Sequence, residues 1–362
     1  MALAIALGKR GLGRCWPNPS VGAVVVEPSS GQVISCGWTS PGGRPHAEVN
    51  ALTDAGAATR GATLYATLEP CAHWGRTPPC SDAVIAAGIA RVVYGVVDPD
   101  PRVAGAGLAR LRAHGVSVTE GPLMAEARWL ALGHELRITR GRPFVQLKLA
   151  LDGDGMVPAG NGAPVWATGE VARTRGHLLR AEADAILVGR GTVLADDPDL
   201  TCRLPGLESR SPVRVVLSRN ADLPAQAKML RNLERARVWV VHAIDAPVEN
   251  VSRLGAIGVE CLAVETADNG GLDIRAVART LAERGITRLL VEGGPLVSAG
   301  FLRADLVDEA VLFQSRTPID GACLQPVGLS ALSESAKYRL YQQTPVGADM
   351  MTVFRRAQVW PG

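Results

Sequence analysis

The sequence predicts a chain of two α/β domains, and three observations support this. Its 362 residues are enough for two domains at about 150 residues each. Short runs rich in Val, Ile and Leu alternate with helical segments along the whole chain, which is the pattern of layered α/β domains. A long helical segment over 123–141 runs into the Arg, Gly and Pro residues of 140–143. We therefore expect one domain over residues 1–140 and a second over 141–362.

In the first domain, residues 1–13 read as a helix leading into the fold rather than as a signal peptide. Two β-rich runs around the turn-like segment PSSG are expected to form a hairpin, and glycines are expected to end the helices. The expected strands are 21–26, 32–38, 62–70, 91–97 and 116–121, and the expected helices are 46–56, 80–88, 108–115 and 123–141.

The second domain repeats this alternation and ends in a pair of strands that reads as a closing hairpin. Its expected strands are 144–152, 185–189, 213–218, 237–243, 288–294, 308–313, 338–343 and 349–356, and its expected helices are 169–183, 274–285 and 295–302.

The composition argues against several classes of protein. With 47% hydrophobic residues and a net charge of +3, the chain is typical of globular proteins with substantial cores. It has no basic run or stripe and only 4% aromatic residues, so a nucleic-acid partner is not expected. No stretch is apolar and long enough for a membrane span. Seven scattered cysteines favour a reducing compartment, and we expect the protein in the cytoplasm.

The strongest functional signal is a histidine and two cysteines at the ends of expected elements. His46 precedes a helix, Cys71 follows Pro70 in the loop after a strand, and Cys80 begins another helix. One imidazole and two thiolates are typical ligands of a catalytic zinc ion, which keeps its fourth position for water. Glu48 is expected to move protons during catalysis. The order H-x-E and then P-C is the signature of zinc nucleobase deaminases.

Other interpretations of these residues remain open. A lone His-x-Glu is most often a surface helix turn, and a lone buried cysteine is usually a small core side chain. The zinc could also be purely structural, in a protein that binds a ligand without converting it. A structural zinc site, however, needs four protein ligands. The sequence offers three, together with Glu48, and this favours a catalytic site.

The spacing of the two cysteines narrows the class of deaminase. Eight residues separate Cys71 from Cys80, where nucleic-acid-editing deaminases usually carry C-x-x-C. With PNPSVG at 17–22 and the segment 97–99, this loop resembles the deaminase half of the bifunctional deaminase/reductase family of riboflavin biosynthesis. The resemblance implies a cytidine-deaminase-like domain with α/β/α layers. It also implies substrate-binding residues, with His73 or Arg76 at the substrate phosphate: Asn18, His73, Arg76 and Asp98.

The second half carries a weaker signal of its own. It has no G-x-G-x-x-G after its first strand, and the glycine pair 293–294 is a turn that can bring N–H groups to a phosphate. The segments 148–155, 166–169, 180–189 and 191–201 resemble the reductase half of the same family, which implies a dihydrofolate-reductase-like α/β domain that uses NADPH. The implied cofactor-binding residues are Ala150, Trp166, Thr192, Asp196, Gly294, Pro295 and Leu296. The implied substrate-binding residues are Arg180, Leu200, Arg203 and Glu292, with Lys148 as the candidate catalytic residue.

Two departures from the family pattern concern the cofactor. Asp152 and Gly153 stand where relatives often carry Ser-Leu, and an extra carboxylate beside a cofactor phosphate is unfavourable. Ser218-Arg219 stands where many relatives carry Asp-Ser. We expect Arg219 to pair with the 2′-phosphate of NADPH.

The resemblance implies two successive reactions on one metabolite. The first domain deaminates 2,5-diamino-6-ribosylamino-4(3H)-pyrimidinone 5′-phosphate by zinc-dependent hydrolysis, and the second uses NADPH to reduce the ribosyl chain to ribityl. The expected partners are this phosphorylated small molecule and further copies of the chain in a homo-oligomer, without nucleic acid or membrane. The alternative is a zinc nucleobase or nucleoside deaminase whose C-terminal domain is not catalytic.

Overall fold

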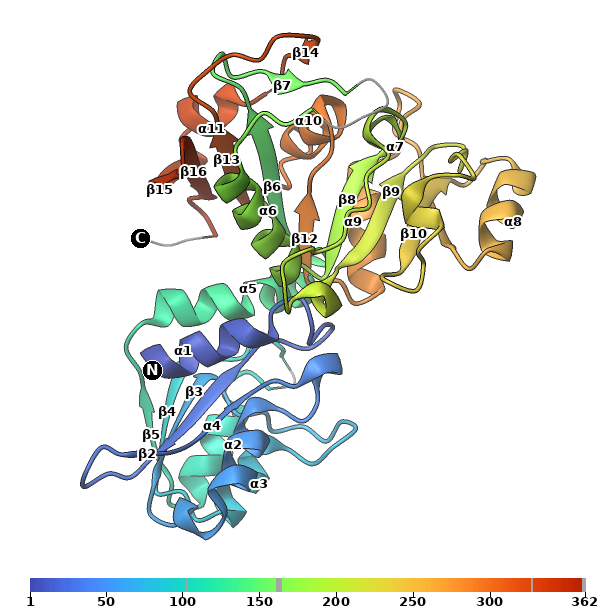
Figure 1. The fold of residues 1–362 in the computed structure, drawn as a ribbon. Helices are drawn as coiled ribbons and strands as arrows, with labels where there is room; N and C mark the ends of the chain where they lie inside the picture. Colours follow the sequence, from blue (N-terminus) through green and yellow to red (C-terminus); the bar gives the residue numbers. More distant parts are fainter. Residues whose placement is uncertain (102, 161–164, 327, 360–362) are drawn as a thin grey trace. The chain divides into compact units, whose positions relative to one another are not determined.

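A computed structural model describes residues 1–101, 103–160, 165–326 and 328–359 (Figure 1). The chain divides into two compact units, Met1–Arg142 and Pro143–Gly362, and each has its own sheet. The division falls two residues after the position expected from the sequence. Among the described residues, no helix combines the length and the apolar character that crossing a bilayer requires.

The first unit is built on a five-stranded sheet in the order β2-β1-β3-β4-β5. β1 and β2 form the expected antiparallel hairpin, β1 also pairs antiparallel with β3, and β3, β4 and β5 run parallel. The strands are β1 Gly22–Val26, β2 Val33–Trp38, β3 Thr63–Leu68, β4 Arg91–Val96 and β5 Ser117–Glu120.

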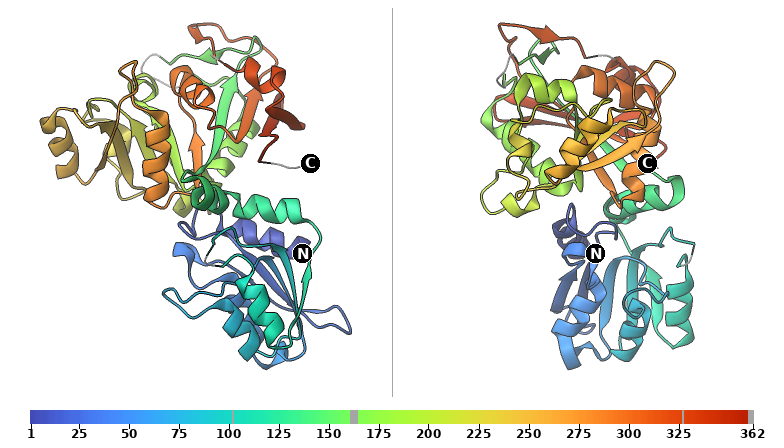
Figure 2. Two further views of the ribbon diagram at one scale, coloured as in Figure 1. Left: turned by 180° about the vertical axis from the view of Figure 1, so that it is seen from behind. Right: turned by 90° about the vertical axis from the view of Figure 1, so that its right-hand side faces the viewer.

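Helices cover both faces of this sheet, with α1 and α5 on one face and α2, α3 and α4 on the other (Figures 1 and 2). Val25, Leu64 and Val92 of the strands are fully buried against Ala51 of α2 and Leu111 of α4. The elements form the three layers expected of a cytidine-deaminase-like domain. The helices are α1 Ala2–Gly8, α2 Ala47–Ala55, α3 Cys80–Ala86, α4 Ala106–Ala113 and α5 Met124–Arg140, with short helices η1 Lys9–Gly11, η2 Pro41–Gly43 and η3 Gly56–Thr59.

The second unit has a nine-stranded sheet in the order β11-β10-β9-β8-β12-β6-β13-β16-β15. It is parallel from β11 to β13, and β16 and β15 close it as the expected antiparallel hairpin. The strands are β6 Phe144–Leu151, β8 Ala185–Gly189, β9 Val213–Leu217, β10 Val238–Ala243, β11 Glu260–Val264, β12 Arg288–Val291, β13 Glu309–Gln314, β15 Tyr338–Val346 and β16 Asp349–Arg356. The short strands β7 Val157–Pro158 and β14 Cys323–Leu324 pair separately.

Helices lie on both faces of the larger sheet as well, with α6 and α9 on opposite sides (Figures 1 and 2). The α/β class expected from the sequence is therefore confirmed for both units. The sequence analysis did not identify α7, α8 or β11, because short segments with Gly and Pro nearby read as loops. The helices are α6 Glu170–Glu182, α7 Arg190–Asp196, α8 Val248–Ala256, α9 Ile274–Glu283, α10 Pro295–Arg303 and α11 Ser330–Glu334, with η4 Glu208–Arg210 and η5 Lys228–Leu230.

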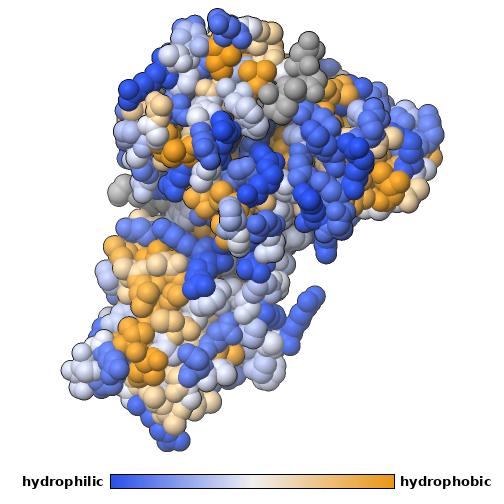
Figure 3. All heavy atoms as spheres, viewed as in Figure 1, coloured by the Kyte–Doolittle hydropathy of each residue, from blue (hydrophilic) through white to orange (hydrophobic). Residues whose placement is uncertain are grey.

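On the face shown in Figure 3, hydrophilic side chains cover much of the surface, and apolar ones gather over α1 and the start of α5. Leu3, Leu123 and Met124 are among the exposed apolar side chains of these elements. Apolar atoms make up much of the surface of any folded protein, so these side chains carry no assignment by themselves.

Candidate active sites

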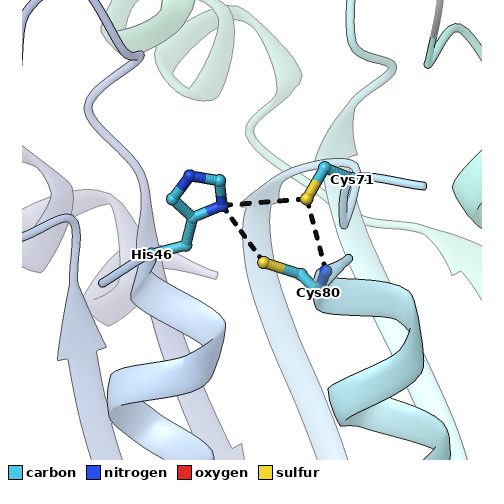
Figure 4. Close-up of side chains that lie close together, drawn as sticks. All are labelled: His46, Cys71 and Cys80. Carbon is cyan, nitrogen blue, oxygen red and sulfur yellow. Dashed lines mark hydrogen bonds between the residues drawn. The ribbon is translucent and has the colours of Figure 1, made fainter. Parts of the chain in front are cut away.

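The three expected metal ligands come together in the first unit (Figure 4). His46 is the residue before α2, Cys71 lies in the loop after β3, and Cys80 is the first residue of α3. The backbone N–H of Cys80 donates to Sγ of Cys71 over 3.3 Å. The hydrogen bond between the two thiols lowers the pKa of Cys71, which favours a thiolate there.

The distances between the ligand atoms fit a zinc ion. Nδ1 of His46 lies 3.2 Å from Sγ of Cys80 and 3.8 Å from Sγ of Cys71. With Zn–N of about 2.0 Å and Zn–S of about 2.3 Å, neighbouring ligands of a tetrahedral ion lie about 3.5 Å apart. In the part of the chain that the structure describes, no fourth side chain joins these three. The donor set therefore suits zinc with one position left for water.

Glu48 lies beside these ligands in the first turn of α2 and is buried. Burial raises the pKa of its carboxyl group to about 7, against the opposing charge of His46. A carboxyl group with a pKa near neutrality can both take up and release a proton, which is what a general acid–base catalyst requires.

A cleft of about 600 Å³, part of it open to solvent, lies at this site. Several candidate residues line it together, and Arg76 is not among them, because its side chain is exposed on the loop between the cysteines. The candidate residues that line the cleft are Asn18, His46, Glu48, Cys71, His73 and Asp98.

Two of the four residues expected to bind substrate, Asn18 and Asp98, are held in place by hydrogen bonds. Nδ2 of Asn18 donates to the carbonyl oxygen of Gly43 over 2.8 Å, and Oδ1 of Asp98 accepts from the N–H of Asp100 over 2.9 Å. His134 of α5, which the sequence analysis missed, places Nε2 3.7 Å from Oδ1 of Asp98. Asn18 and Asp98 are thus held at the lining of the cleft, where an amide and a carboxylate can bind a polar substrate.

Glu69 is a further residue that the sequence analysis did not identify. Its buried carboxylate accepts hydrogen bonds from the N–H groups of Gly105, Gly107 and Leu108 at the start of α4, and from that of Asp98. Its position directly before Pro70-Cys71 was the only signal in the sequence. Glu69 thus connects the loop of Asp98 to the first turn of α4 and fixes the position of this part of the cleft lining.

In the second unit, four candidate residues meet at the ends of parallel strands. Glu292, directly after β12, accepts two hydrogen bonds from Arg180 of α6 and has Nζ of Lys148 at 3.7 Å. Burial alone raises the pKa of Glu292, but the charges of Arg180 and Lys148 outweigh it and lower the pKa to about 2. Arg203 lies close enough to Arg180 that burial and this second charge lower its pKa. Such crowding of positive charge is suited to an anion.

His177 of α6 belongs to the same group and was not among the expected residues. Its Nδ1 accepts from the N–H of Arg203 over 3.4 Å, and burial together with the nearby arginines lowers its pKa to about 4. Leu200, expected at the substrate, has its side chain packed in the core, and its backbone has a φ of +59°.

Most expected cofactor residues follow the carboxyl ends of parallel strands. Thr192 lies in α7 after β8, and its Oγ1 is 3.6 Å from the place that a Cβ on Gly294 would take. Gly294 precedes α10, with Pro295 at its first position and Leu296 83% exposed. Such a strand-to-helix turn offers free backbone N–H groups to a phosphate.

The remaining cofactor candidates are more widely spread in the unit. Ala150 lies on β6, and Asp196 ends α7 with its pKa raised by burial. Trp166 is 58% exposed, with the guanidinium of Arg173 5.2 Å from its ring. Arg219, just after β9, donates Nη2 to Asp245 over 2.8 Å and Nε to the carbonyl oxygen of Gly270 over 3.1 Å.

Asp152 has a structural role in its loop. Its Oδ1 accepts from the N–H groups of Asp154 and Met156, and its Oδ2 from that of Ile319. The hydrogen bond from Met156, with those from Ile319 and Asp154, lowers the pKa of this carboxyl group. The extra charge noted in the sequence is thus compensated by backbone donors of the 152–156 turn.

Both units match known families. Residues 1–96 match the cytidine and deoxycytidylate deaminase zinc-binding region, and residues 143–318 match the RibD C-terminal domain. The chain is 39% identical over 357 residues to the riboflavin biosynthesis protein RibD of Aquifex aeolicus, covering 98% of this chain and 97% of the relative. It is 37% identical over 374 residues to that of Escherichia coli, covering 97% and 96%.

Solved structures agree with these matches over nearly the whole chain. The RibD structure of Acinetobacter baumannii superposes with a TM-score of 0.84 at 34% identity, covering 98% of this chain and 97% of that one. The diaminohydroxyphosphoribosylaminopyrimidine deaminase/5-amino-6-(5-phosphoribosylamino)uracil reductase of Thermotoga maritima gives 0.83 at 37% identity, with the same coverage.

Proposed function

The chain belongs to the RibD family and is a zinc-dependent deaminase joined to an NADPH-dependent reductase of riboflavin biosynthesis, and from this we propose which of its residues carry each reaction. The match of residues 143–318 to the RibD C-terminal domain favours a catalytic second unit over the alternative of a deaminase with a non-catalytic one. The substrate is a small phosphorylated pyrimidine.

In the deaminase, the observation that supports the proposal is the meeting of His46, Cys71 and Cys80 beside the buried Glu48. When bound, zinc supplies the Lewis acidity for hydrolysis. The carboxylate of Glu48 takes up a proton as water adds to the ring carbon that bears the amine, and it then delivers that proton to the departing amine. Nitrogen thus leaves as ammonia, and an oxygen replaces it on the ring.

Substrate recognition in the deaminase is assigned to the polar residues of the cleft. Asn18 and Asp98 are assigned to hydrogen bonds with the ring and its exocyclic groups, since both line the cleft and are held there by hydrogen bonds. His73 of the cleft and the exposed Arg76 are the phosphate contacts suggested by the resemblance.

In the reductase, we assign the substrate phosphate to Arg180 and Arg203, and the sugar to Lys148 and Glu292. NADPH supplies the hydride when it is bound. Lys148 and Glu292 form an ion pair at 3.7 Å. As the sugar ring opens, the ammonium of Lys148 can stabilise partial negative charge on one sugar oxygen, and the carboxylate of Glu292 can stabilise partial positive charge on another. Leu200 contributes its backbone, because its side chain is buried.

We assign the cofactor to the carboxyl edge of the parallel strands, where dinucleotides bind in open α/β sheets. The turn of Gly294, Pro295 and Leu296 faces Thr192 and suits a phosphate. Arg219 is assigned to the 2′-phosphate of NADPH. To bind it, Arg219 has to give up its hydrogen bond to Asp245 and form one to the phosphate. The remaining cofactor contacts are assigned to Ala150, Trp166 and Asp196.

We further propose a cytoplasmic homo-oligomer that binds neither nucleic acid nor membrane. None of the seven cysteines forms a disulfide, in keeping with a reducing compartment. Sedimentation at several concentrations tests the assembly, and a purely monomeric chain would contradict it.

A coupled assay tests the proposed function. The zinc-loaded chain receives the diaminopyrimidinone ribotide with and without NADPH, and ammonia release and NADPH oxidation are followed separately. We expect ammonia in both cases and NADPH oxidation only after deamination. Ammonia without NADPH oxidation would contradict the reductase assignment, and zinc-loaded protein that releases no ammonia would contradict the deaminase assignment.

A further inference from the structure

The deaminase cleft has to accommodate a phosphate among carboxylates. Glu48, Asp98 and Asp100 all line it and are buried. A phosphate monoester carries close to two negative charges at neutral pH, so a positively charged side chain beside it would offset the repulsion from these carboxyl groups. Among the described residues that line the cleft, Arg44 is the one whose side chain is always positively charged.

Arg44 lies against the loop between the two zinc-ligand cysteines. Its Nη1 donates a hydrogen bond to Oγ1 of Thr77. Its Nη2 lies 3.0 Å from the point where a Cβ on Gly75 would stand, and Nε2 of His73 lies 3.8 Å from the same point. Because Gly75 has no side chain, the guanidinium and the imidazole both border this space.

Most hydrogen-bonding capacity around this space is unused. Arg44 has five N–H donors, and within the described residues Thr77 takes one of them and no carboxylate pairs with the guanidinium. The Thr77 hydroxyl accepts from Arg44, so it can donate its own hydrogen elsewhere. Nδ1 of His73 is buried without a hydrogen-bond partner in the described part of the chain. The guanidinium of Arg44 and the imidazole of His73 thus border one small volume, and Thr77 holds the guanidinium there.

We propose that Arg44, held by the exposed Thr77, binds the 5′-phosphate of the ribotide in the deaminase cleft together with His73 and makes this unit selective for phosphorylated substrate. The inference rests on the proposed function. Arg44 takes the place suggested for Arg76, whose side chain is exposed and does not line the cleft. The planar fork of Arg44 can meet two phosphate oxygens at once, which a lysine cannot do.

The test compares two substrates on the zinc-loaded full chain. Ammonia release is measured with the ribotide and with the same compound lacking its phosphate. Arg44→Gln should raise KM for the ribotide about 10- to 100-fold, the range for losing a charge-assisted contact, and leave KM for the dephosphorylated compound within about twofold. Arg44→Lys should fall between, and competitive inhibition by inorganic phosphate should weaken in parallel.

Two further variants separate the alternatives. Arg60→Gln changes an exposed arginine of the same unit outside the cleft and should leave both KM values unchanged. Arg76→Gln tests the competing assignment, and a selective loss of ribotide there but not in Arg44→Gln overturns the proposal.

An equal rise in KM for both substrates in Arg44→Gln would also overturn the proposal. That result is expected if Arg44 only holds the loop of Thr77 in place and does not contact the phosphate. Arg44→Gln can be read only if it keeps its zinc. If it loses zinc, inhibition by inorganic phosphate is measured on Arg44→Lys instead. Inhibition as strong as in the unaltered chain then contradicts the proposal. An unaltered chain that releases no ammonia from either substrate contradicts the proposed function itself.

Discussion

In the reductase unit the carboxylate of Glu292 accepts two hydrogen bonds from Arg180, from Nε to Oε1 over 2.8 Å and from Nη2 to Oε2 over 2.9 Å. The two residues are 112 positions apart in the sequence. Arg180 lies in the last turn of α6, whereas Glu292 follows β12. This forked pair therefore joins the helix to the strand at the proposed substrate site, with Lys148 as a second positive neighbour.

Glu292→Gln should destabilise the reductase unit. The change removes the negative charge and leaves the buried guanidinium of Arg180 without its counter-charge. We expect the free energy of unfolding in urea at pH 7 to fall by about 3 kcal/mol. Glu283→Gln, an exposed glutamate of the same unit, is the matched control and should change it by less than about 0.5 kcal/mol.

The lowered pKa of Glu292 makes the stability difference between the unaltered chain and Glu292→Gln depend on pH. Glu292 has a pKa of about 2 in the folded chain against an ordinary value of 4.5, so its carboxylate stabilises the fold fully above pH 4.5. That stabilisation is lost as the pH falls from 4.5 toward 2. The gap between the unaltered chain and Glu292→Gln should shrink over the same window, and a gap that stays constant would contradict the ion pair.

Glu48→Gln should stop deamination without disturbing the zinc site. The amide keeps the shape of the side chain but cannot accept the proton, and losing a general acid–base catalyst costs about 100- to 10,000-fold in rate. Ammonia release measures kcat, and metal analysis should still find zinc bound. Asp54→Asn, on the exposed side of the same helix, is the control. Retention of kcat within about tenfold would exclude Glu48 as the proton carrier.

Removal of zinc should separate the two activities. A chelator is expected to abolish ammonia release, which added zinc restores, while reduction of the deaminated intermediate by NADPH continues. Cys80→Ser should lower the bound zinc per chain, and Cys36→Ser, which is outside the metal cluster, should not. Loss of both activities on chelation would mean that the metal also supports the reductase.

Glu69→Ala should weaken the deaminase unit and displace Asp98. Four backbone N–H groups lose their acceptor, and unsatisfied buried donors cost about 1–3 kcal/mol each before relaxation. We expect a total loss of about 2–5 kcal/mol in thermal or urea unfolding, together with a higher KM for the ribotide. Glu126→Gln, exposed on α5, is the comparison. An unchanged KM would show that Glu69 does not position Asp98.

Arg219→Ala should affect NADPH more than NADH. If Arg219 binds the 2′-phosphate, its loss should raise KM for NADPH about tenfold and leave KM for NADH nearly unchanged, since NADH lacks that group. Arg275→Ala, an exposed arginine of α9, should alter neither. The same ratio of the two KM values before and after the change would rule out the assignment and leave Arg219 as the partner of Asp245.

The sequence alone predicted the two α/β domains, a break near 140 and the set His46, Cys71 and Cys80, which lie together in the structure. These features depend on local patterns, because each metal ligand lies within a few residues of the end of a helix or strand. The alternation of apolar runs and the glycine stops indicated those ends directly. Family resemblance added the reactions, which residue spacing alone did not supply.

Only the tertiary structure decided which side chains share a site. The order of the larger sheet places β12 between β8 and β6, so Glu292 meets Arg180 and Lys148 although they are far apart in the chain. The same folding turns Arg76 outward and brings Arg44 to the cleft. A sequence pattern records which residues are polar, but side-chain neighbours depend on contacts between distant segments, and these form only when the sheets are assembled.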